Sequence, residues 1–127
     1  MKQTVTLTIT SLLSILLVTF HVSDDVVRGM EKGGVSNLTV VPILVVWLYG
    51  TLALAERRSG YVILLLGSLL GSGIPVIHMK GKGVGEIAKS SGGFFFVWTL
   101  LALGVISIFS VILSTRGLWS LRRSQPR

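Results

Sequence analysis

Residues 5–29 read VTLTITSLLSILLVTFHVSDDVVRG, and this stretch holds the change of character that organises the chain. Its first sixteen residues, Val5 to Phe20, carry no charge, whereas the next nine hold a histidine, two adjacent aspartates and an arginine. A helix needs roughly 20 predominantly apolar residues to cross the hydrocarbon of a bilayer. The stretch therefore predicts a membrane-spanning helix whose polar end emerges at one membrane surface.

The whole chain repeats this pattern. Of its 127 residues 50% are hydrophobic and only 13% are charged, against about 25% in soluble domains, and the mean hydropathy is +0.79. Four uncharged runs are each about as long as a membrane span: Gln3 to Phe20, Asn37 to Ala55, Ser59 to Ile77 and Ser90 to Thr115.

These runs predict one domain, residues 1–127, with an all-α integral membrane fold: an antiparallel four-transmembrane-helix bundle in up-down-up-down order. The expected spans cover about residues 4–22, 38–56, 60–78 and 92–115. We expect outer loops at 23–37 and 79–91, an inner turn at 57–59 and a cytoplasmic tail at 116–127.

Composition excludes several classes of protein. The loops are too short to hold a soluble nucleotide-binding or nucleic-acid-binding domain. The net charge of +7 comes from basic residues spread over the loops and the tail, as membrane insertion favours, so no nucleic-acid partner is expected. There is no cysteine, which removes disulfides, thiolate metal sites and iron–sulfur clusters, so that any redox role would need a cofactor.

The distribution of basic residues suggests an orientation. Seven Lys and Arg residues fall on the side of the two termini and five on the other, and the positive-inside rule assigns the richer side to the cytoplasm. We therefore expect a multi-pass plasma (inner) membrane protein with both termini cytoplasmic. Four of the five acidic residues and both histidines then lie on the outer side.

Small residues predict where the helices meet. Without water between them, membrane helices associate through close packing at glycine, alanine and serine. The third run carries two small pairs four residues apart, and the fourth carries a further glycine among regularly spaced serines. The residues predicted to pack helices, or to form a homo-oligomer face, are Gly67, Gly71, Ser68, Ser72 and Gly104.

The polar end of the opening stretch has a helical period. At about 100° per residue, the polar and charged side chains fall on one face of the helix, about a third of its circumference, and valines and a methionine occupy the rest. We expect the first helix to continue beyond the hydrocarbon, or to restart at Ser23, with this face turned to water or to the other loops. The polar face consists of His21, Asp24, Asp25, Arg28, Glu31 and Lys32.

The second histidine raises the possibility of a site at this rim. His21 lies nineteen residues after Lys2, and His78 eighteen after Gly60, so at 1.5 Å per residue both lie at about the same depth. The candidate polar rim site is His21, Asp24, Asp25, Arg28 and His78.

Three ligands are compatible with such a rim, besides a simple solvated helix face. A haem would use His21 and His78 as axial ligands between two helices. A divalent metal would use both histidines and Asp25. An anion or a lipid headgroup would be held by Lys80 and Lys82 in the glycine-rich segment that follows.

The interior argues against other functions. Ion-coupled transporters generally place an ionisable residue at bilayer depth, whereas the middles of all four runs contain none. No nucleophile motif indicates catalysis. The prediction is a small integral-membrane accessory or binding protein with an outward-facing rim site, embedded in the lipid bilayer as a homo-oligomer or part of a larger membrane complex. The alternatives are a haem- or metal-binding redox subunit and a small homodimeric transporter.

Overall fold

The computed structural model describes residues 3–29, 38–80 and 84–124, and all regular structure there is helical, without a strand. The helices are α1 (Gln3–Val27), α2 (Val40–Leu52), α3 (Arg58–Lys80), α4 (Val84–Lys89) and α5 (Gly93–Arg123). The all-α part of the predicted fold is confirmed. Glu31, Lys32 and Lys82, which the predicted rim and anion sites include, lie outside the described residues.

Three of these helices, α1, α3 and α5, are by length and composition long and apolar enough to cross a membrane. The second predicted span, 38–56, corresponds to a shorter apolar helix. α2 has 13 residues, which at 1.5 Å per residue gives about 20 Å against the ~30 Å of hydrocarbon. It ends at Leu52, and the chain then turns toward α3 through Glu56, whose φ is 65°.

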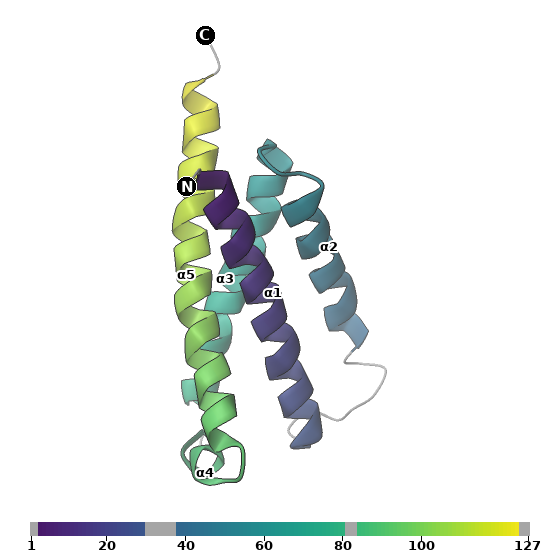
Figure 1. Ribbon diagram of the computed structural model, residues 1–127, viewed down its shortest axis with the longest axis vertical. Helices are drawn as coiled ribbons and strands as arrows, with labels where there is room; N and C mark the ends of the chain where they lie inside the picture. The colour runs from purple at the N-terminus through teal and green to yellow at the C-terminus, as the bar shows by residue number, and fades with distance from the viewer. Residues whose placement is uncertain (1–2, 30–37, 81–83, 125–127) are drawn as a thin grey trace.

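The long helices run in alternating directions, and both ends of the chain lie at the same end of the molecule (Figure 1). α5 packs against both α3 and α1, and α2 packs mainly on α3 at the side of the bundle. The short helix α4 lies at the end opposite the termini (Figure 1). At the terminal end, Gln3 Nε2 donates to the carbonyl of Leu113 at 3.0 Å, which ties the start of α1 to α5.

Glycines set the distances between the helices. The Trp47 side chain of α2 lies against Gly67 of α3, and the Ser107 hydroxyl of α5 lies against Gly71, so close that a Cβ at either glycine would clash. A Cβ at Gly104 would lie 3.1 Å from Pro75 Cγ. These predicted packing residues lie at interfaces between helices, as does the fully buried Ser68. Ser72 instead is half-buried and donates to Leu69 O of its own helix.

Hydroxyl groups link the helices inside the bundle. Trp47 Nε1 donates to Ser11 Oγ at 2.9 Å, and Ser11 shares a 2.7 Å hydrogen bond with Thr51. Ser107 donates to Ser14 at 3.3 Å. Such interhelical bonds satisfy polar groups that no water reaches and fix the lateral register of the helices.

Candidate functional site: a His–Asp–His cluster at one end of the bundle

The candidate site lies at the end of the bundle opposite the termini. α1 remains helical through Val27, without a restart at Ser23, whose hydroxyl donates to Thr19 O within the helix. His21 and Asp25 are therefore one helical turn apart on one face of α1. His78 lies in the last turn of α3, which ends at Lys80. Equal depth, expected from residue counting, places these side chains opposite one another.

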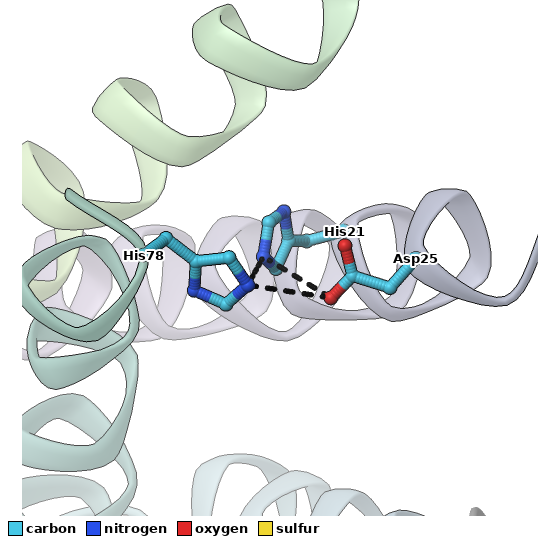
Figure 2. Close-up of side chains that lie close together, drawn as sticks. All are labelled: His21, Asp25 and His78. Carbon is cyan, nitrogen blue, oxygen red and sulfur yellow. Dashed lines mark hydrogen bonds and ion pairs between the residues drawn. The ribbon is translucent and has the colours of Figure 1, made fainter. Parts of the chain in front are cut away.

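Three ligand atoms converge at this point (Figure 2). His21 Nε2 and His78 Nε2 are 3.2 Å apart. Asp25 Oδ2 lies 3.5 Å from His21 Nε2 and 3.5 Å from His78 Nε2. We call His21, Asp25 and His78 the His–Asp–His cluster.

The cluster is largely withdrawn from solvent. His21 is 1% exposed and Asp25 6%, whereas the His78 side chain remains 21% exposed. The fully buried ring of Phe96, from α5, lies 5.2 Å from the His21 ring and 6.0 Å from the His78 ring between centroids. Phe96 thus covers one side of the cluster, and solvent can reach the cluster from the side of His78.

This burial reverses the expected orientation of the polar face. His21 and Asp25 point into the bundle, and Val27 on the opposite side is 84% exposed. In water this arrangement would be unfavourable, but at a membrane surface an exposed valine can contact lipid. The amphipathic period is present, and it turns its polar side toward α3 and α5.

Two buried polar atoms of the cluster lack a protein partner. His21 Nδ1 and Asp25 Oδ1 have no hydrogen bond within the described part of the chain. A buried carboxylate without compensating charge is costly, and its nearest neighbours in the cluster are two imidazoles. A cation held between the three side chains would supply the compensating charge.

The His78 ring is oriented by its own helix. His78 Nδ1 lies 2.9 Å from the carbonyl of Ile74, and a carbonyl can only accept, so Nδ1 carries the proton and donates. In the neutral ring, Nε2 then presents its lone pair toward His21 and Asp25. Histidines that bind metals are commonly held by such a bond from the second ring nitrogen.

The cluster dimensions agree with one face of a zinc tetrahedron. Zn²⁺ binds imidazole nitrogen and carboxylate oxygen at about 2.0–2.1 Å, which places neighbouring ligand atoms about 3.3 Å apart. The observed separations are 3.2, 3.5 and 3.5 Å. Three protein ligands would leave a fourth position open, as in catalytic rather than structural zinc sites.

The same distances do not suit a haem between the two histidines. Axial ligands on opposite sides of a haem iron are about 4 Å apart, with the porphyrin between them. Here the two Nε2 atoms are 3.2 Å apart, and the rings contact each other edge to face with centroids 4.6 Å apart. The described geometry has no space for a macrocycle between these rings.

Asp24 and Arg28 form a separate contact beside the cluster. Arg28 Nε donates to Asp24 Oδ2 at 2.6 Å, and Nη1 donates to Ser90 Oγ at 3.0 Å. The guanidinium carbon also lies 5.8 Å from the centre of the Phe96 ring. The Arg28 charge is thereby paired with Asp24, and the side chain ties α1 to the segment between α4 and α5.

Residues singled out at the sequence level fall into two groups. The structure brings together His21, Asp25 and His78, and it places Asp24 and Arg28 next to them. Lys80, from the predicted anion site, is exposed at the end of α3. Phe96 was not predicted: it belongs to the run Phe94 to Phe96, and nothing in three identical neighbours indicates which ring faces inward.

Comparison with known proteins gives no assignment. No protein-family model, no curated protein and no solved structure matches this chain. The function must be argued from the geometry of the chain itself.

Proposed function

We propose that this chain is a small integral-membrane binding protein whose rim holds a divalent transition-metal ion between His21, Asp25 and His78. The observation that carries the proposal is the triangle of ligand atoms, 3.2 to 3.5 Å on a side, in a buried setting. Two further facts support it: a carboxylate oxygen left unpaired, and a His78 lone pair directed by the Ile74 carbonyl.

The ligand types favour zinc or a metal of similar preference. Magnesium and calcium select oxygen ligands, often with several waters, whereas two imidazoles with one carboxylate suit Zn²⁺, Fe²⁺ and neighbouring metals. One carboxylate and two neutral imidazoles leave the complex with a net charge of about +1, which an apolar wall such as Phe96 tolerates better than +2. A water or a substrate group would occupy the open position, entering beside His78.

The membrane arrangement we propose has four spans, with both termini in the cytoplasm and the His–Asp–His cluster at the outer surface of the plasma (inner) membrane. Its support is the alternation of helix directions (Figure 1) and the excess of seven basic residues over five at the terminal end. In this arrangement α2 is the second span in chain order, and it is long enough to cross the bilayer only together with its flanking residues. An outer site would meet metal ions outside the cytoplasm.

We further propose that the chain works in an assembly, as a homo-oligomer or an accessory subunit, because a bundle of this size encloses little space. An apolar groove of about 330 Å³ between α2 and α3, lined by residues that include Pro42, Val46 and Leu70, supports this. A transporter is less well supported, because the buried polar side chains along the middle of the described bundle carry hydroxyl groups, and the buried ionisable pair, His21 and Asp25, lies at one end.

The test is metal binding by the purified protein. Wild-type protein in detergent, dialysed against Zn²⁺ and then against metal-free buffer, is expected to retain about one equivalent by elemental analysis. Co²⁺ loading is expected to give the visible absorption bands of a four-coordinate site. Asp25→Asn should lose both signals, and Asp24→Asn should keep them, although both remove a carboxylate from the same turn.

Two results would contradict the proposal. One is metal retained equally by Asp25→Asn and wild type, which would place the ion elsewhere. The other is wild-type protein without stoichiometric zinc, iron or cobalt. A Soret band in the purified protein would favour the haem alternative and require rings further apart than those described.

A further inference from the structure

The terminal end of the bundle has a different chemistry from the His–Asp–His cluster, and it is independent of that proposal. Five arginines gather there, from the turn before α3, the start of α3 and the last turns of α5. We call them the basic collar: Arg57, Arg58, Arg116, Arg122 and Arg123. All five are exposed.

Helix length places the collar at the membrane surface. α5 has 31 residues, about 46 Å at 1.5 Å per residue, against ~30 Å of hydrocarbon. Its residues from Gly93 to Thr115 already cover about 34 Å. The turns from Arg116 to Arg123 therefore extend into the layer of lipid headgroups, and Figure 1 shows this end of α5 projecting beyond the other helices.

Close packing brings the start of α3 to the same level. The ring of Tyr61 lies directly against Gly117, at a distance that leaves no room for a Cβ. Tyr61 is also in contact with the buried Leu113, with Leu118 and Leu121 packed alongside. Arg58, one turn before Tyr61, and Arg122, just over one turn after Gly117, are thereby held on either side of one groove.

This groove has a volume of about 400 Å³ and is amphipathic. Its apolar part is formed by Val62, Leu118 and Leu121, and its polar part by Arg58 and Arg122 with Glu56 and Ser124. The Glu56 carboxylate already accepts a 3.0 Å hydrogen bond from the Thr4 hydroxyl of α1. Two guanidinium groups from different helices thus face an apolar channel at headgroup depth.

We infer that this groove binds an anionic phospholipid, with the phosphate between Arg58 and Arg122 and an acyl chain along Val62, Leu118 and Leu121. Guanidinium groups bind phosphate through paired N–H donors, and arginines next to membrane spans attract anionic lipids. Among the described charged residues at this end, Glu56 is opposed by five arginines, so a net negative headgroup is favoured over a zwitterionic one. The site belongs to the two-helix groove, and the remaining collar arginines contribute only a general positive field.

The test compares two variants that remove the same charge from the same end. Wild type, Arg58→Gln/Arg122→Gln and Arg57→Gln/Arg123→Gln are purified in detergent and titrated with phosphatidylglycerol or phosphatidylcholine, with bound lipid counted by native mass spectrometry. Wild type is expected to hold one phosphatidylglycerol in preference to phosphatidylcholine. The groove variant should bind phosphatidylglycerol roughly ten- to thirtyfold more weakly, as losing two arginine contacts implies, and the control variant should change by less than about threefold.

Three outcomes would overturn the inference. Equal losses in the two variants would show a general effect of charge rather than a groove. Equal binding of phosphatidylcholine and phosphatidylglycerol would remove the anionic preference. Inorganic phosphate at matched concentration that excluded phosphatidylglycerol would show that the arginines recognise the phosphate without the lipid chain. All four substituted residues are exposed, and unchanged elution and helix content verify that the variants fold.

Discussion

The two ends of the bundle use ionisable side chains in opposite ways. At one end His21 and Asp25 are buried, and their polar atoms face one another and His78. At the other end five arginines are exposed around a groove. Burial makes each interaction strong and each partner necessary, whereas water and salt weaken the interactions of an exposed charge. The buried end is thus suited to one specific ligand, and the exposed end to an abundant one such as lipid.

The largest effect is expected from the location of the two ends, which we predict to lie on opposite sides of the membrane. A reporter active only in the cytoplasm is expected to work when fused after Arg127 and to fail when inserted at Gly85. Reporters active only outside should give the reverse pattern. Activity is all or none in such assays. The opposite pattern would invert the assignment of the two ends. Activity of both fusions on the same side would exclude an odd number of spans between them, and with it the single crossing by α5.

The next largest effect is expected at the buried end, where partners should act as one unit. Zinc at about 100 times its Kd should stabilise wild type by about 2.7 kcal/mol, and His21→Ala and His78→Ala should each abolish this gain in thermal unfolding. The double variant should then be no worse than either single one, because the site is already lost. Independent, additive partial losses would instead indicate two separate interfacial histidines.

A smaller effect on stability is expected at the contact between α3 and α5 in the middle of the bundle. Gly71→Leu forces a large side chain against Ser107 and Leu103 and should cost about 1–3 kcal/mol of stability, seen as a lower unfolding temperature in detergent. Gly73→Leu is the matched control, because a Cβ there meets nothing within 4 Å, and it should change stability by no more than about 0.5 kcal/mol. If the two variants behave alike, α3 does not pack on α5 through Gly71.

The smallest effect is expected for Arg28, which is partly exposed although it lies beside the buried cluster. Arg28→Gln removes its pairing with Asp24 and should cost no more than about 1 kcal/mol. Hydrogen exchange at the amides of Ser90 and Gly93 should become faster, because Arg28 holds that turn through Ser90 Oγ. Lys89→Gln is the control and should leave this exchange unchanged. A zinc-binding loss as large as that of Asp25→Asn would make Arg28 part of the site.

The sequence predicted these features to different degrees, for physical reasons. Length and hydropathy predicted the helices, and a constant rise per residue was enough to place His21 and His78 at the same depth. The period of 3.6 put His21 and Asp25 on one face. Period alone, however, cannot choose between water and protein as the neighbour of that face. The choice depends on α3 and α5, which are distant in sequence.

Other features depend on contacts that no local pattern records. Phe96 faces inward where it meets the His21 ring of α1 and the His78 ring of α3, and both helices are distant in sequence. A turn was predicted at 57–59, but the positive φ of Glu56, unusual for glutamate, was not. The groove at the basic collar requires Tyr61 to meet Gly117, a pairing of residues 56 positions apart.

The shortness of α2 has a consequence for the surrounding lipid. At about 20 Å, or about 24 Å with the short helical turn at Leu38 and Thr39, it does not match the ~30 Å hydrocarbon thickness that α1, α3 and α5 can fill. Hydrophobic mismatch of this kind is relieved by local thinning of the bilayer, at a cost of fractions of a kcal/mol per Å. In the proposed four-span arrangement this flank would favour thin membrane, and two copies that brought their α2 flanks together would share a single thinned patch of bilayer.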